Sequence, residues 1–91
     1  MEIILDINQF CTRSRAHAYL KEMLAFPEYY GENLDELHDC LTSLGPTHIR
    51  FQGKVPSSGE YYQKILRVFR DSARENPDLV IEEAWQDGVN G

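Results

Sequence analysis

Basic residues are absent from a long central part of this sequence. No lysine or arginine occurs between Lys21 and Arg50, whereas six aspartates and glutamates do, and the 91 residues together carry a formal net charge of -6. Nucleic acids and anionic membranes are bound through lysine and arginine, so this charge argues against either as the direct ligand. The charge suits a basic partner, or it only keeps the protein soluble.

Cysteines and long apolar runs are scarce as well. Cys11 and Cys40 are the only cysteines, they form neither C-x-x-C nor zinc-ligand spacing, and one pair is too few for a disulfide scaffold. No stretch approaches membrane-spanning length, and the start of the chain lacks the basic segment and long apolar run of a signal peptide. We therefore expect a cytoplasmic protein with free thiols.

The hydrophobic pattern predicts short strands that alternate with helices. Strands are expected at residues 2–7, 48–52 and 79–83, and helices at residues 14–25, 34–44 and 60–75. This alternation predicts an α/β fold with a small three-stranded parallel sheet and right-handed crossovers, packed with about three to four helices. We expect a single domain over residues 1–91, of which the polar, glycine-containing end at 84–91 is mobile.

The predicted helix at residues 34–44 separates its apolar and acidic residues. At about 100° per residue, one arc of roughly 80° that must face the core holds its four leucines: Leu34, Leu37, Leu41 and Leu44. Asp35, Asp39 and Thr42 share an arc of roughly 60° on another, solvent-facing side, and His38 lies on the border. Two acids one turn apart cost a helix about a few tenths of a kcal/mol, so their grouping does not favour folding.

The loop before this helix adds Tyr29, Tyr30 and Gly31. Tyrosines are enriched at binding hot spots, and a glycine can leave backbone groups open to a partner. A plain structural interpretation competes with this one. Acidic helices are often only solvated, the helix dipole favours Asp35 near the N-terminus, and the tyrosines could be half-buried packing residues. The residues alone leave both interpretations open.

A longer run of residues favours binding. Pro27-Glu28-Tyr29-Tyr30-Gly31-Glu32-Asn33-Leu34-Asp35, continued by Leu37 and Asp39-Cys40-Leu41-Thr42, resembles the inhibitory loop and helix of the barstar family. Weaker similarity extends to about residue 83 and includes Val68-Phe69-Arg70-Asp71. The resemblance implies a small parallel sheet with helices. It also implies a binding protein, without enzymatic activity or cofactor, that is monomeric when free and blocks the active site of a secreted, basic, guanyl-type ribonuclease in a 1:1 complex.

The resemblance also assigns roles to single residues. Asp39 would mimic the RNA phosphate and accept hydrogen bonds from the cations of the enzyme, and Asp35 would pair with a second basic group. The other residues implied in partner binding are Tyr29, Tyr30, Gly31, Asn33, Leu34, His38 and Thr42, with Asp71 and Glu75 as peripheral acids. The sequence departs from the family pattern at His38, where a tryptophan is expected, and at Ser43-Leu44, where a Gly-Trp pair is expected. These departures put the identity of the partner in doubt.

Two other functions compete with ribonuclease inhibition. Asp35, His38 and Asp39 have a spacing that can place metal ligands on one helix face, with His48 as a further candidate, but a catalytic site needs more ligands and a pocket. We therefore expect no metal, and Cys40, near the buried side of its helix, is expected to be structural rather than a nucleophile. A barstar-like interaction module that binds another basic protein, such as a different toxin nuclease, remains open.

Overall fold

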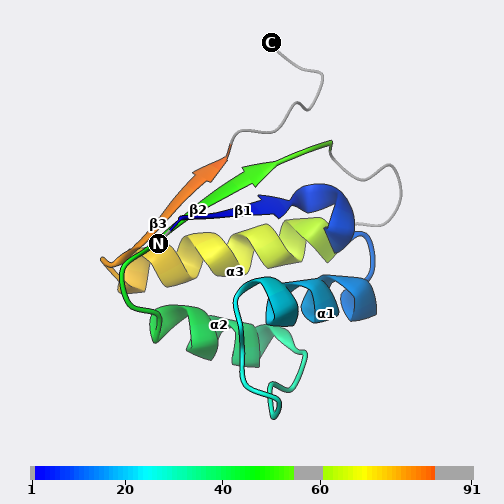
Figure 1. Cartoon of the computed structure of the whole chain (residues 1–91), viewed down its shortest axis with the longest axis horizontal. Helices are drawn as coiled ribbons and strands as arrows, with labels where there is room; N and C mark the ends of the chain where they lie inside the picture. Colours follow the sequence, from blue (N-terminus) through cyan, green and yellow to red (C-terminus); the bar gives the residue numbers. More distant parts are fainter. Residues whose placement is uncertain (1, 55–60, 84–91) are drawn as a thin grey trace.

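The computed structural model describes residues 2–54 and 61–83, which form a sheet covered on one face by helices (Figure 1). The strands β1 (Glu2–Asp6), β2 (Thr47–Gln52) and β3 (Leu79–Glu83) are parallel and lie in the order β1-β2-β3. The helices are α1 (Arg13–Met23), α2 (Leu34–Thr42) and α3 (Tyr61–Glu75). The predicted α/β fold with a three-stranded parallel sheet is confirmed, whereas residue 60 and the tail at 84–91 lie outside the described residues.

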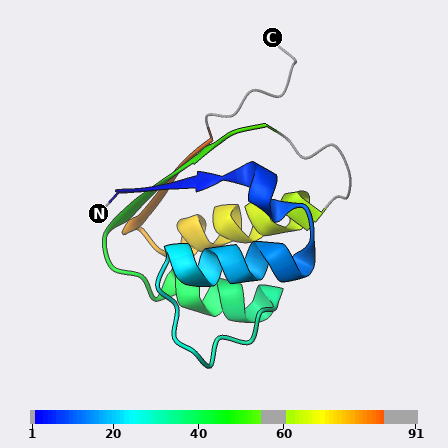
Figure 2. The same ribbon diagram turned by 45° about the vertical axis from the view of Figure 1, so that its right-hand side comes forward.

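The alternation along the strands decides which face of the sheet is buried. Leu5 in β1 and Ile49 and Phe51 in β2 have no exposed surface and point toward the helices. Figure 2 shows all three helices on that side of the sheet. The opposite face exposes apolar residues such as Ile4 and Val80, and it carries His48 in the middle strand. Helix α2 therefore lies on the far side of the core from His48.

Five element boundaries differ from the predicted ones by one or two residues. Helix α1 ends at Met23 and strand β2 begins at Thr47, and local hydrogen bonds explain the other three. Strand β1 ends at Asp6 because its side chain accepts a hydrogen bond from the backbone N–H of Asn8 at 2.9 Å and starts a 3-10 turn, η1 (Ile7–Phe10). Helix α1 begins after Thr12, whose hydroxyl accepts from the N–H of Arg15 at 3.2 Å. Helix α2 ends at Thr42, where Ser43 caps it, so the helix is two residues shorter than expected.

Helix α2 is fixed at its C-terminal end by a side chain that follows α3. The amide of Asn76, which is buried, donates to the backbone carbonyls of Leu41 and Leu44, both at 3.0 Å. Leu37 and Leu41 are fully buried beneath the helix, as the leucine stripe predicts, whereas Leu34 and Leu44 are half-buried at its two ends. Since carbonyls at a helix C-terminus lack partners within the helix, these bonds hold α2 against α3.

Candidate protein-binding site

The acidic face of α2 is presented to solvent as the sequence predicts. The side chain of Asn33 caps the helix by accepting a hydrogen bond from the N–H of Glu36 at 2.8 Å. Asp35 and Asp39 are exposed, and within the described residues no hydrogen bond or ion pair engages either carboxylate. Thr42 is half-buried, and its hydroxyl donates to the backbone carbonyl of Asp39 at 3.1 Å. Two carboxylates without a partner in the described part of the chain therefore stand on a helix that the core residues Leu37 and Leu41 hold in place.

The two tyrosines of the loop have opposite environments. Tyr29 is 85% exposed, whereas Tyr30 is only 5% exposed. The N–H of Tyr30 donates to the carbonyl of Pro27 at 3.0 Å, and its ring lies 4.8 Å from that of Phe26, centre to centre. Each of the two interpretations left open by the sequence fits one tyrosine in the free protein: Tyr29 is presented to solvent, whereas Tyr30 packs in the core and anchors the loop. A contact of Tyr30 with a partner stays a prediction, limited to its small exposed area.

Gly31 is engaged within the loop rather than left open. Its N–H donates to a carboxylate oxygen of Glu36 at 3.1 Å, and its carbonyl accepts from the side-chain amide of Asn33 at 3.4 Å. A Cβ atom at Gly31 would lie 3.0 Å from that amide nitrogen and 3.1 Å from Cγ of Glu36, closer than ordinary contacts. The expectation of free backbone groups at Gly31 is therefore corrected, because Glu36 of α2 and the N-cap Asn33 bind them and thereby order the loop.

A buried histidine that is not among the residues expected from the sequence connects this loop to two helices. His17 of α1 has no exposed surface, and its Nδ1 and Nε2 lie 2.6 Å from the hydroxyl of Tyr30 and 2.7 Å from that of Tyr61. A neutral imidazole can satisfy both hydroxyls, since one nitrogen donates and the other accepts. A signal was present in the sequence, because His17 lies between Ala16 and Leu20 on the apolar side of its helix.

The environment of His17 predicts a loss of stability in mild acid. Burial, assisted by the positive charge of Arg13, lowers the pKa of His17 below its ordinary 6.5, although the charge of Glu32 opposes this effect. The unfolded chain then binds the proton more readily than the folded protein, so the free energy of unfolding falls as the pH drops below about 6.5 and levels off only once folded His17 is protonated. Urea titrations between pH 7.5 and pH 5 measure this slope. If the free energy of unfolding of His17→Gln fell equally steeply with pH, the loss of stability could not be attributed to His17.

The described part of the chain offers no metal centre to these residues. It contains no group of three or more His, Cys, Asp or Glu side chains that could hold an ion. His48, the extra ligand considered from the sequence, pairs with Glu82 at 3.2 Å on the open face of the sheet, away from α2. Burial raises the pKa of the Cys40 thiol, with the charges of Glu36 and Asp39 acting in the same direction, which disfavours a reactive thiolate.

The length and polarity of the helices also bear on membrane insertion. In residues 2–54 and 61–83, no helix is both long and apolar enough to cross a bilayer.

Cys11 and Cys40 are both free thiols and half-buried.

Comparison of the sequence with known proteins assigns it to a family. The family model described as Barstar (barnase inhibitor) matches residues 1–85. The chain belongs to the barstar family. The Bacillus subtilis (strain 168) protein named "Putative ribonuclease inhibitor YrdF" is 37% identical over an alignment 89 residues long, and the match covers 89% of this chain and 98% of that protein. The match to the barstar family includes every described strand and helix, as well as the loop and the acidic face of α2.

Within this barstar-family chain, the residue that departs from the expected aromatic at position 38 has a partner of its own. His38 Nε2 lies 3.1 Å from a carboxylate oxygen of Glu75 at the end of α3. Asp71, one turn earlier, lies 3.1 Å from Arg74. The two peripheral acids therefore belong to the helix beside α2, and Glu75 is brought to the acidic face by His38. Their contact with a partner stays a prediction.

Proposed function

We propose that this protein inhibits a guanyl-type ribonuclease by covering its active site with α2 and the loop before it. The observation that carries the proposal is the pair of exposed carboxylates, Asp35 and Asp39, which lack a hydrogen bond or ion pair within the described residues and stand on a helix fixed by Leu37, Leu41 and Asn76. Membership of the barstar family supports the inhibitory role. In this proposal, the protein is not an enzyme, needs no cofactor, acts in the cytoplasm and is monomeric when free.

The proposed mechanism is substrate mimicry. A ribonuclease active site holds the RNA phosphate with arginine, lysine and histidine side chains, and a carboxylate that is held rigidly can take the place of the phosphate. In this proposal Asp39 occupies that position, Asp35 binds a second cation, and Tyr29 packs against the enzyme surface. Little conformational entropy is lost on binding, because the hydrogen bonds of Gly31, Asn33 and Glu36 already order the loop in the free protein.

Titration against a panel of basic guanyl-type ribonucleases tests the function. We expect one member of the panel to bind in a 1:1 complex with a dissociation constant at or below the nanomolar range and to lose its activity on RNA. Because the inhibitor is acidic and the enzyme basic, association should slow as salt is added. Isothermal titration calorimetry, stopped-flow kinetics and an RNA-cleavage assay measure these three results. Absence of binding to every member would exclude ribonuclease inhibition of this type.

His38 motivates a second candidate, an interaction module that binds a different basic protein such as another toxin nuclease. The aromatic expected at this position is replaced by a histidine that is tied to Glu75, so the surface beside Asp39 is polar and differs from the family pattern. The same calorimetric series, extended to basic nucleases of other folds, separates the two candidates. Tight binding to one of these, together with none to the guanyl-type panel, would favour the second.

A further inference from the structure

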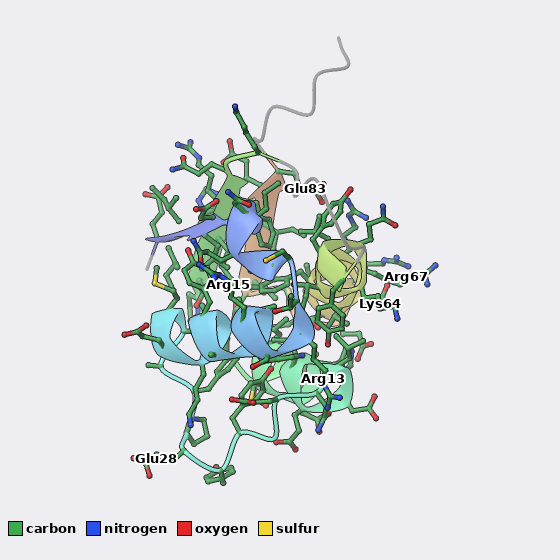
Figure 3. All side chains as sticks on the ribbon, turned by 90° about the vertical axis from the view of Figure 1, so that its right-hand side faces the viewer. Arg13, Arg15, Glu28, Lys64, Arg67 and Glu83 are labelled. Carbon is green, nitrogen blue, oxygen red and sulfur yellow. The ribbon has the colours of Figure 1, made fainter. Side chains whose placement is uncertain are left out.

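A pocket opens at the N-terminal end of α2, beside the acidic face. Its volume is about 500 Å³, within the range of sites that admit ligands or side chains of a partner. Three helices line it: Arg13 from α1, Tyr61 and Lys64 from α3, and Asn33, Leu34 and Asp35 from α2 and its cap. Figure 3 shows Arg13 and Lys64 on the flank where these helices meet. The pocket thus joins the proposed binding face to two basic residues that the mechanism above does not use.

The charges around the pocket are not neutralised within it. Among the described residues, neither Arg13 nor Lys64 forms an ion pair with Asp35, although all three line the same space. Within residues 2–54 and 61–83, the one hydrogen bond that the Arg13 side chain donates is to the backbone carbonyl of Glu32, at 3.4 Å, and both basic side chains are exposed. Two cations brought together from different helices repel each other and do not favour folding. The space between them is therefore suited to an anionic group supplied from outside.

Asp35 restricts which anion can enter. A free phosphate ion bound between Arg13 and Lys64 would leave the carboxylate of Asp35, in the same pocket, without a basic partner. A protein surface can instead bring an acid for the two cations and, next to it, a base for Asp35. An adjacent acidic and basic pair on a protein matches all three charged groups that line the pocket, which a simple anion does not.

We propose that this pocket is a specificity site that receives an acidic side chain of the partner ribonuclease, whose carboxylate binds between Arg13 and Lys64 beside a basic residue that pairs with Asp35. The inference rests on the proposed function and narrows it. Basic ribonucleases that lack an acid next to the residue that pairs with Asp35 leave two cations of the inhibitor unpaired at the interface. Such enzymes are bound more weakly, even when their active sites are identical.

The variant Lys64→Glu tests the pocket through the direction in which it changes the affinity for the ribonuclease. The matched control is Lys54→Glu, which makes the same change of charge at an exposed residue after β2. On net charge alone, both variants are more acidic and should bind a basic enzyme as tightly as the wild type or tighter. If the pocket receives a carboxylate, Lys64→Glu weakens binding at least about tenfold while Lys54→Glu does not. Calorimetry against the ribonuclease bound by the wild type measures both.

Further measurements separate the possible failures. Circular dichroism and the urea midpoint confirm that each variant is folded, and Lys64→Met, which removes the charge without reversing it, should give a smaller loss of affinity. Equal or tighter binding of a folded Lys64→Glu to an enzyme that binds the wild type would overturn the pocket assignment and leave the proposed function intact. Saturable binding of inorganic phosphate at Arg13 and Lys64, followed by NMR, would also overturn it. Failure of the wild type to bind any ribonuclease would remove both proposals.

Discussion

Replacing Asp39 with alanine is expected to weaken binding to the partner ribonuclease by at least about 2 kcal/mol, or roughly thirtyfold in Kd. A loss of about this size is the usual definition of an interface hot spot, and a complex of this family is one of the examples behind that definition. The proposed complex buries this carboxylate among cations of the enzyme, and truncation leaves those cations unpaired. Since no hydrogen bond or ion pair engages the Asp39 carboxylate in the described part of the free protein, its removal should change the stability of the inhibitor little. Calorimetry measures the affinity, and urea unfolding measures the stability.

The control for Asp39→Ala must remove one negative charge without disturbing the binding face. Glu36→Ala is unsuitable, because the Glu36 carboxylate accepts the N–H of Gly31 and orders the loop. Glu22→Ala meets the requirement, since Glu22 is exposed on α1 and its loss changes the net charge equally. We expect a change of less than about threefold in Kd for this control, consistent with the small effect of a peripheral charge. Similar losses for the two variants would mean that total charge, not mimicry by Asp39, governs binding.

Replacing His17 with alanine is expected to lower the free energy of unfolding by about 3 kcal/mol or more. The substitution removes two hydrogen bonds, leaves the buried hydroxyl of Tyr30 and the partly buried hydroxyl of Tyr61 without their partner, and opens a cavity under the loop. A small domain has a total stability of only about 5–15 kcal/mol, so this loss is a large part of it. Urea denaturation followed by circular dichroism at pH 7.5, where His17 is neutral, measures the change.

His48→Ala is the matched control for His17→Ala. His48 contacts Glu82 on the open face of the sheet, where a surface pair contributes about 1 kcal/mol or less. If both histidine variants lost the same stability, the buried bridge of His17 would have no special role. Affinity gives a second readout, because a loop released from Tyr30 must be ordered on binding and His17→Ala should therefore bind more weakly than His48→Ala.

Local chemistry explains why so much of this fold could be predicted. The leucine spacing in α2 fixes which side of the helix faces the core, and the side chain of Asn33 determines where the helix begins. Strand β3 occupies residues 79–83 as predicted, and the alternation of short strands and helices leaves few arrangements other than a parallel sheet. These features depend on neighbours within a few residues, which is the range over which sequence patterns carry information.

Contacts between distant segments decided the rest. Tyr29 and Tyr30 are identical neighbours in the sequence, yet one is presented and the other is buried, because only Tyr30 reaches His17 of α1. The pocket that unites Arg13 and Lys64 with Asp35 exists only where three helices meet, and those residues are separated by up to 51 positions along the chain. The sequence by itself determined the elements, the family and the acidic face of α2. The tertiary structure alone decided which loop residues anchor that face and which basic residues lie beside it, since packing between helices places side chains that no local pattern relates.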